Sequence, residues 1–167
     1  MSTLADVSRV LNELRSERVV EDYAVGGAMA VLFYAEPART YDLDVFVTLH
    51  GSAESLLDLS ALYGCLKGRG FTPDAGHVLI HGVPVQFLPV YNRLVAVAVA
   101  EARELSYDDT PVRVVSPEYL VALALQAGGS RRRERAAQLL EAGAVDRVVL
   151  RGILDRHRLD PGGMLDE

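Results

Sequence analysis

The segment from Tyr23 to Val47 constrains the fold most, because it places two carboxylates one residue apart within an apolar run. It reads YAVGGAMAVLFYAEPARTYDLDVFV. Asp is depleted in strands and costly to bury without a partner. Residues i and i+2 of a strand point to the same face, with Cα atoms about 7 Å apart. Asp42 and Asp44 can therefore close on one hard cation, and we expect Mg²⁺ or Mn²⁺ there.

A glycine pair, Gly26 and Gly27, stands between a predicted strand over 22–25 and a predicted short helix over 28–34. Glycine at a strand-to-helix turn lets the backbone approach a ligand, and the free N–H groups of a helix start suit a phosphate. Taken alone, a glycine pair more often makes a simple turn. With the two aspartates downstream, the layout predicts a site for a metal-bound triphosphate.

This segment resembles the signature of the nucleotidyltransferase superfamily of the polymerase-beta type. The closer resemblance is to the branch that includes the abortive-infection (type IV) toxin nucleotidyltransferases. The family motif has Gly-Gly or Gly-Ser, a helix, and often Arg and Thr shortly before Asp-x-Asp. Here the motif stands as Gly26-Gly27, then Arg39-Thr40-Tyr41-Asp42-Leu43-Asp44. Three later stretches also resemble this branch: VQFLPVYNRL at 85–94, VVSPEYLVALALQAG at 114–128 and LLEAGAVD at 139–146.

The resemblance implies a metal-dependent transfer of a nucleoside monophosphate from an NTP to a hydroxyl of an RNA, a protein or a small molecule. Two Mg²⁺ ions about 3.5–4 Å apart would activate the hydroxyl and neutralise the leaving pyrophosphate. Catalysis and metal binding are then assigned to Asp42 and Asp44. The triphosphate is assigned to Gly26 and Gly27, with support from Arg39 or Thr40.

The family usually draws a third carboxylate from a neighbouring strand, and this chain departs from that pattern. The matching strand is expected over 83–89, where the central polar residue is Gln86. A neutral amide is a weaker metal ligand and a much weaker base, although its carbonyl can coordinate an ion or contact the ligand. Asp108 or Asp109, in an expected loop over 106–110, are the alternative acids. Without a third acid the alternative function is a catalytically silent NTP sensor or a toxin–antitoxin interaction module.

Arginines gather at the start of a predicted helix over 131–141, in the run RRRER. Positive charge there opposes the helix dipole by about 0.3–1 kcal/mol per residue. A solvated helix face explains most charge runs. Because the charges are unfavourably placed for this helix, anion binding is an equally good explanation here. Arg131 and Arg132 are the candidates for contacting a triphosphate or an RNA backbone. Many relatives have a Lys-Asp pair at these two positions and a Lys at the position of Ala124, which also motivates the silent alternative.

Composition and charge narrow the class of protein. The chain of 167 residues is 50% hydrophobic and 24% charged, which is typical of a globular domain. A net charge of −6 argues against bulk binding to nucleic acid. The apolar runs are too short to span a bilayer, and the N-terminal residues form no apolar signal core. We therefore expect a cytoplasmic protein with no membrane partner, and the sequence leaves the oligomeric state open.

The residue pattern predicts an α+β fold, with a small mixed sheet, flanking helices and a C-terminal helical subdomain. We expect a nucleotidyltransferase-like core over 1–115, the helical subdomain over 116–160 and a flexible tail over 161–167. On a strand over 77–81, His77 and His81 would lie about 13 Å apart, so no zinc site is expected. The other expected helices are 4–14, 52–67, 92–104, 116–128 and 145–158, and the other strands are 43–48 and 112–115.

Overall fold

The computed structural model describes residues 3–34, 42–50 and 58–165. Within them, seven strands form one mixed sheet in the order β3-β4-β5-β2-β1-β7-β6. The strands are β1 Asp22–Gly26, β2 Leu43–Thr48, β3 Pro73–Asp74, β4 His77–Ile80, β5 Val83–Pro89, β6 Arg103–Tyr107 and β7 Thr110–Val114. The helices are α1 Thr3–Ser16, α2 Gly27–Ala30, the 3-10 turn η1 Val31–Phe33, α3 Ser60–Gly68, α4 Arg93–Ala100, α5 Pro117–Ala127, α6 Ser130–Glu141 and α7 Arg147–Arg156.

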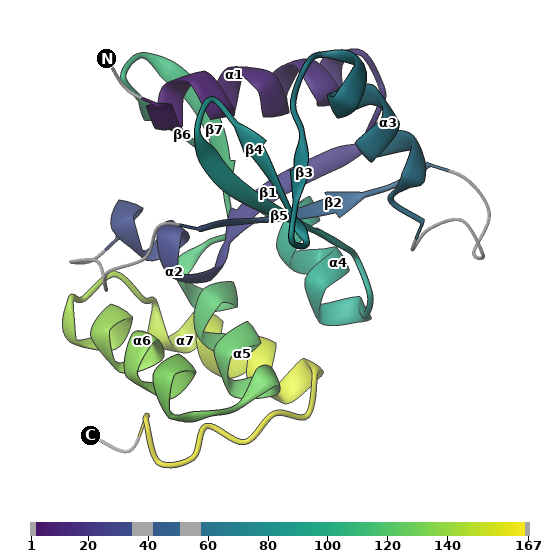
Figure 1. The fold of residues 1–167 in the computed structure, drawn as a ribbon. Coiled ribbons are helices and arrows are strands. Elements are labelled where there is room, and N and C mark those ends of the chain that lie inside the picture. Colours follow the sequence, from purple (N-terminus) through teal and green to yellow (C-terminus); the bar gives the residue numbers. More distant parts are fainter. Residues whose placement is uncertain (1–2, 35–41, 51–57, 166–167) are drawn as a thin grey trace.

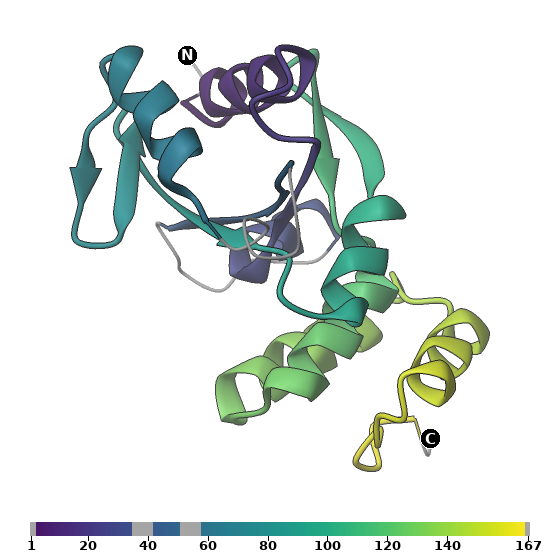
Figure 2. The same cartoon turned by 90° about the vertical axis from the view of Figure 1, so that its right-hand side faces the viewer.

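The sheet separates two groups of helices (Figure 1). Helices α1 and α3 lie on one face, whereas α4 and the C-terminal helices α5–α7 lie on the other, as the rotated view in Figure 2 also shows. The side chains of strand β2 alternate between the two faces of the sheet. Leu43, Val45 and Val47 are fully buried, and Asp44 and Phe46 point to the opposite face. The predicted α+β fold class is confirmed.

The register of the central strands places the predicted site residues side by side. Strands β1 and β2 are antiparallel, with Gly26 opposite Asp44. Strands β2 and β5 are parallel, with Asp44 opposite Gln86. Opposed residues of neighbouring strands share a face of the sheet. The side chains of Asp44 and Gln86 therefore lie next to each other at the centre of the sheet.

The predicted helix over 92–104 is too long. Helix α4 ends at Ala100, and β6 begins at Arg103 as part of a hairpin with β7. Asp108 and Asp109 form its turn with φ values of 48° and 60°. Strand β6 is an edge strand whose side chains are mostly exposed, so it lacks the apolar alternation that identifies a half-buried strand.

Two other predicted helices differ in extent. The helix expected over 28–34 is a four-residue α-helix, α2, followed by the 3-10 turn η1. The helix expected over 52–67 is described only from Ser60, as α3, because 51–57 lie outside the described residues. No helix in the described part of the chain is long and apolar enough to cross a membrane.

A buried carboxylate, Glu118, holds the C-terminal helices together. Its side chain is 5% exposed and accepts from the backbone N–H of Asp146, at the start of α7, over 3.2 Å. The guanidinium of Arg103 on β6 donates to the same carboxylate over 3.2 Å. Farther along, the Leu165 side chain is buried and its carbonyl accepts from Arg151 of α7 over 2.9 Å. The division into 1–115, 116–160 and 161–167 stays a prediction, although Leu165 is anchored.

Candidate functional site

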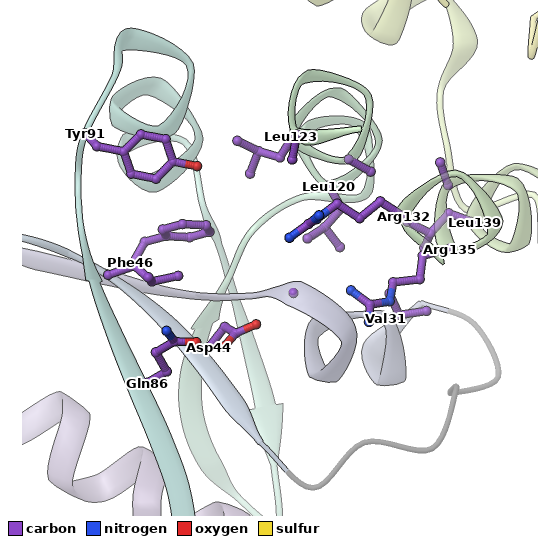
Figure 3. Close-up of a pocket in the computed structure, with 15 residues that line it drawn as sticks. Val31, Asp44, Phe46, Gln86, Tyr91, Leu120, Leu123, Arg132, Arg135 and Leu139 are labelled. Carbon is purple, nitrogen blue, oxygen red and sulfur yellow. The ribbon is translucent and has the colours of Figure 1, made fainter. Parts of the chain in front are cut away.

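A pocket of about 320 Å³ lies between the sheet and the C-terminal helices (Figure 3). Its floor comes from β2 and β5, and its walls come from η1, α5 and α6. The lining residues are Gly27, Val31, Asp44, Phe46, Gln86, Leu88, Tyr91, Leu120, Leu123, Ala124, Ala127, Arg132, Arg135, Ala136 and Leu139. This volume is at the lower end of the range for small-molecule sites.

Gly27 sits against the carboxylate of Asp44. A Cβ atom on Gly27 would overlap the Asp44 Oδ2 atom, and the φ of Gly27 is +62°, in the left-handed region that favours glycine. A Cβ on Gly26 would come within 2.5 Å of the Phe46 ring. The glycine pair is therefore required for the close approach of the strand-to-helix turn to β2. The sequence predicted that the backbone at this glycine pair comes close to a ligand, but it did not predict this contact with the neighbouring strand.

The Asp44 carboxylate is partly buried at the pocket floor. Burial raises its pKa above the usual value of 3.8. The guanidinium of Arg135 opposes that rise in pKa, the negative charge of Asp42 adds to it, and His77 and Arg132 oppose it more weakly. Asp44 is thus a partly buried carboxylate with both cationic groups and a second carboxylate near it, an environment that favours a charged ligand over an apolar one.

Two arginines of α6 face the pocket floor. Arg132 and Arg135 are three residues apart, so they lie on the same side of the helix. Figure 3 shows both guanidinium groups pointing from α6 into the pocket, toward Asp44. Arg132 also donates to the carbonyl of Gly128 over 3.3 Å. The pocket therefore carries two positive charges opposite a carboxylate.

The remaining wall is apolar. Phe46, Leu88 and Tyr91 line the sheet side, and Leu120 and Leu123 line the α5 side. Tyr91 is 56% exposed at the mouth, and Figure 3 shows its ring above Phe46 and facing Leu123. Aromatic and aliphatic walls with a few polar groups are typical of small-ligand sites.

Asp42 lies just before β2, beside the pocket and not in its lining. Its side chain is 54% exposed, and its Oδ2 atom is 3.6 Å from Nε2 of His77 on β4. The negative charge of Asp42 raises the pKa of Asp44, so the two carboxylates are close enough to interact, as the Asp-x-Asp spacing implied.

The structure brings together four of the predicted site residues. Gly27, Asp44, Gln86 and Arg132 line one pocket. Gly26 and Asp42 adjoin it, whereas Arg131 is exposed and is not among its lining residues. Arg39 and Thr40 lie outside the described residues. The roles of all these residues stay predictions.

Two residues at the site were not predicted. Arg135 belongs to the noted arginine run, and its spacing of three from Arg132 on a helix was the signal that could have identified it. His77 was set aside with His81 because their separation along a strand excludes a shared metal. Its contact with Asp42 depends on the order of the strands, which the local pattern does not reveal.

Asp108 and Asp109 do not supply the missing third acid. They form the β6–β7 turn, and β7 runs parallel to β1 with Val114 opposite Val25. The turn therefore lies at the end of β7 away from Gly26 and the pocket. Among the described lining residues, Asp44 is the one carboxylate.

The donor chemistry of the site suits a divalent cation. Asp42, Asp44 and the side-chain carbonyl of Gln86 are oxygen donors of the kind that Mg²⁺ and Mn²⁺ bind. The glycine at position 27 leaves room for the Asp44 carboxylate that a Cβ would take. Within the described residues, no three Asp, Glu, His or Cys side chains are already grouped as a metal site. Asp42, with its exposed side chain, would have to turn toward Asp44 to share an ion.

No protein-family profile matches this chain, and no curated protein matches it. Several solved structures are similar. The antibiotic-resistance factor ANT(2'')-Ia in solution has a TM-score of 0.56 and 13% identity, covering 93% of this chain and 91% of the other. The crystal structure of ANT(2'')-Ia in complex with adenylyl-2''-tobramycin has a TM-score of 0.53 and 14% identity, covering 93% and 99%.

A third similar structure is an antigenic nucleotidyltransferase-like protein from Paracoccidioides brasiliensis. Its TM-score is 0.54 and its identity 19%, covering 84% of this chain and 75% of the other. At this level of identity the likeness concerns the fold. The nucleotidyltransferase fold implied by the sequence resemblance is confirmed.

Proposed function

We propose that this protein binds a nucleoside triphosphate together with a divalent metal ion, and transfers the nucleoside monophosphate to a hydroxyl acceptor. The observation that carries the proposal is the single pocket in which Asp44 and Gln86 face Arg132 and Arg135. Carboxylate and amide oxygens suit the cation, and guanidinium groups suit phosphates through their forked donors.

Each residue then has a definite task. Asp42 and Asp44 would hold the ion, and Gln86 would support it through its carbonyl oxygen. A divalent ion held there would stabilise the negative charge that develops on the phosphates. Arg132 and Arg135 bind the phosphates and hold the pyrophosphate as it leaves. The acceptor oxygen forms its bond to the α-phosphorus, the bond from that phosphorus to pyrophosphate breaks, and the hydroxyl proton passes to water.

The apolar wall and the arginines set the ligand's orientation. Phe46, Leu120 and Leu123 offer a dry surface for the base or the acceptor, whereas the phosphates point toward α6. Ala124, where many relatives of the resembled branch carry Lys, also lines the pocket. Arg132 and Arg135 supply positive charge from the next helix in its place. This charge favours an acceptor that is neutral or anionic, such as an RNA.

The solved neighbour bound to adenylyl-2''-tobramycin supports the class of reaction. In that complex an adenylyl group is joined to tobramycin, a small molecule. We extend only the class of transfer to the present chain. The acceptor proposed here is a hydroxyl of an RNA, a protein or a small molecule.

A second candidate function is a silent NTP sensor or a toxin–antitoxin interaction module. The observation that favours it is Gln86, which stands beside Asp44 on β5 where the family usually has an acid. Among the described residues that line the pocket, Asp44 is the one carboxylate. An NTP sensor would bind the nucleotide and metal but would not transfer the nucleotide, and an interaction module would bind a partner protein instead.

Thermal unfolding with each NTP, with and without Mg²⁺ or Mn²⁺, tests the binding step. A ligand at 100 times its dissociation constant stabilises by about 2.7 kcal/mol, which is a shift of several degrees for this size of domain. We expect a metal-dependent shift in the wild type and none in Asp44→Asn. Asp6→Asn is the matched control and should retain the shift, because Asp6 lies on α1 at the opposite face of the sheet (Figure 1) and its side chain is partly exposed. No shift with any NTP contradicts the enzyme and the NTP sensor, and favours the toxin–antitoxin interaction module, for which a partner pull-down is the next test.

Transfer of an α-³²P-labelled nucleotide then separates the two candidates. Transfer to RNA, to protein or to small hydroxyl compounds, lost in Asp44→Asn, supports the enzyme. Metal-dependent binding without transfer to any of these acceptors supports the silent module.

A further inference from the structure

His77 lies one strand beyond Gln86 on the face that carries Asp44. The sheet order is β4-β5-β2 at this point. Val78 of β4 is opposite Val85 of β5 in an antiparallel pair, so His77 comes level with Gln86. Asp44 is opposite Gln86 on the other side. The side chains of His77, Gln86 and Asp44 thus form a row across three neighbouring strands.

The imidazole of His77 is held near the carboxylates. Its Nε2 atom is 3.6 Å from Oδ2 of Asp42, and its side chain is 28% exposed. This separation is longer than a hydrogen bond. One nitrogen donor therefore lies beside Asp42, on the face of the sheet that carries Asp44.

We propose that His77 is the third protein ligand of the metal ion held by Asp42 and Asp44. The inference rests on the metal site of the proposed function, and assigns a nitrogen donor where the family pattern supplies a third carboxylate. Two donors in neighbouring octahedral positions around an ion, each at about 2.1 Å, lie roughly 3 Å apart. The 3.6 Å between Asp42 and His77 is close to that spacing, and Asp42 must also turn toward Asp44 for the three side chains to share an ion.

Gln86 explains why the extra donor is needed. An amide carbonyl carries no net charge and binds a divalent cation less well than a carboxylate. In the described part of the chain, Asp44 is the one carboxylate in the pocket lining. Asp42 and His77 are the pair beside it that can complete the ligand set from the pocket's edge.

A nitrogen donor changes which ion the site prefers. Imidazole suits transition-metal ions, whereas Mg²⁺ takes oxygen ligands and keeps several waters. The site therefore prefers Mn²⁺ or Co²⁺ to Mg²⁺. A site built from Asp42, Asp44 and water alone would lack this dependence on His77.

His81 is the matched control on the same hairpin. It lies in the turn after β4, and its ring packs edge-on against Phe71 with ring centroids 5.3 Å apart. Strand spacing separates it from His77 by about 13 Å, so it cannot ligate an ion held by Asp42. Replacing it removes one imidazole from the same hairpin without touching the proposed ligand set.

The test uses Mn²⁺ alone, without nucleotide, because a base nitrogen could also bind the ion. Electron spin-echo modulation of bound Mn²⁺ detects a coordinated nitrogen directly in the wild-type protein. We expect a histidine nitrogen coupling in the wild type and in His81→Ala, and its loss in His77→Ala. Mn²⁺ affinity in His77→Ala should fall at least about tenfold, since loss of an outer-shell partner alone costs ~10–100-fold. Mg²⁺ affinity, measured by competition, should fall less.

Asp44→Asn distinguishes failure of this inference from failure of the proposed function. Mn²⁺ binding that requires Asp44 but shows no nitrogen coupling, or a coupling that persists in His77→Ala, overturns the ligand assignment and leaves the metal site intact. An equal loss of Mn²⁺ and Mg²⁺ affinity in His77→Ala, with no wild-type nitrogen signal, shows that His77 only positions Asp42. Absence of any Asp44-dependent Mn²⁺ binding contradicts the metal site and the ligand assignment together.

Discussion

Gly27 and Asp44 are in such close contact that no side chain larger than a hydrogen atom fits between them. A Cβ on Gly27 would overlap the Asp44 carboxylate, and Gly27 has a φ of +62°. The same glycine that turns the chain from β1 into α2 thus leaves the space in which the Asp44 carboxylate lies. The turn and the carboxylate form one unit, although 16 residues separate them in the sequence.

Replacing Gly27 with Ala should therefore damage both the fold and the site. We expect Gly27→Ala to lower the free energy of unfolding by about 1–3 kcal/mol, because the backbone is strained and the carboxylate must move. The metal-dependent stabilisation by NTP should be lost as well. Urea unfolding and the nucleotide shift assay measure the two effects.

Gly64→Ala is the matched control for that substitution. Gly64 lies inside α3, and a Cβ there meets nothing within 4 Å. Alanine in a helix interior is favoured over glycine by about 0.5–1 kcal/mol, so this variant should be slightly more stable than the wild type. If the two alanine variants behaved alike, the contact between Gly27 and Asp44 would have no energetic importance.

The raised pKa of Asp44 predicts how stability depends on pH. Burial places the folded-state pKa above 3.8, so the folded protein holds this proton more tightly than the unfolded chain does. The stabilising contribution is present below pH 3.8 and is lost as pH rises through the folded-state pKa. Without metal, Asp44→Asn should therefore melt at a higher temperature than the wild type at pH 7.

The difference in melting temperature between Asp44→Asn and the wild type should vanish in acid, where both side chains are neutral. Calorimetry from pH 3.5 to 7.5 with a chelator present measures it. A variant that is less stable than the wild type at pH 7 would show that the arginines outweigh burial. Added Mg²⁺ or Mn²⁺ with NTP should reverse the order, because the ligand stabilises only the protein that keeps the carboxylate.

The arginines of α6 should differ in their effect on nucleotide binding. Arg132 and Arg135 line the pocket, whereas Arg131 does not. A hydrogen bond to a charged group contributes about 1.5–3 kcal/mol. We expect Arg132→Ala and Arg135→Ala each to weaken NTP binding by at least about tenfold, and Arg131→Ala to change it less than about twofold, as measured by calorimetric titration.

This comparison also tests the sequence-based assignment of Arg131 to the nucleotide. A large loss of NTP affinity in Arg131→Ala, with little change in Arg135→Ala, would support Arg131 as the nucleotide-binding residue. It would contradict binding of the phosphates by the arginines that line the pocket. The three variants differ from one another only in position along one helix, so each serves as a charge-matched control for the others.

Arg113 should be important for the stability of the sheet that carries the site. Its side chain is 13% exposed and lies 2.9 Å from Asp22. It also donates to the carbonyls of Tyr23 on β1 and Val99 on α4, over 3.1 and 2.9 Å. Arg113→Ala leaves these acceptors without their donor and should cost about 2–4 kcal/mol.

An exposed ion pair gives the control for Arg113. Arg9 pairs with Asp6 on α1, and more than a third of each side chain is exposed. Arg9→Ala should change the free energy of unfolding by less than about 1 kcal/mol. Urea unfolding of both variants measures the change in the free energy of unfolding. A similar loss of stability in Arg9→Ala and Arg113→Ala would contradict the special role of Arg113.

Local patterns accounted for much of the site. The apolar run around Asp44 predicted strand β2, the family pattern together with the central polar residue of the strand over 83–89 identified Gln86, and the glycine pair located the turn before α2. Each of these signals needs only a few consecutive residues, because the period of a strand and the conformational freedom of glycine are local properties. The edge strand β6 escaped prediction since its exposed side chains lack that alternation.

Other site residues depend on contacts between distant parts of the chain. Arg135 reaches the pocket because α6 packs beside α5 across from β2, and His77 meets Asp42 because β5 lies between β4 and β2. Asp108 and Asp109 are excluded as the third acid by the direction of β7. None of these relations can be read from neighbouring residues.

The sequence by itself predicted the type of fold and the centre of the candidate site, because the spacing of Asp42 and Asp44 and the Gly26–Gly27 turn depend only on neighbouring residues. Only the tertiary structure decided which charges surround that centre. Strand order, register and the packing of α6 are set by the whole core, so only they place Arg132 and Arg135 in the pocket of Asp44 and His77 beside Asp42.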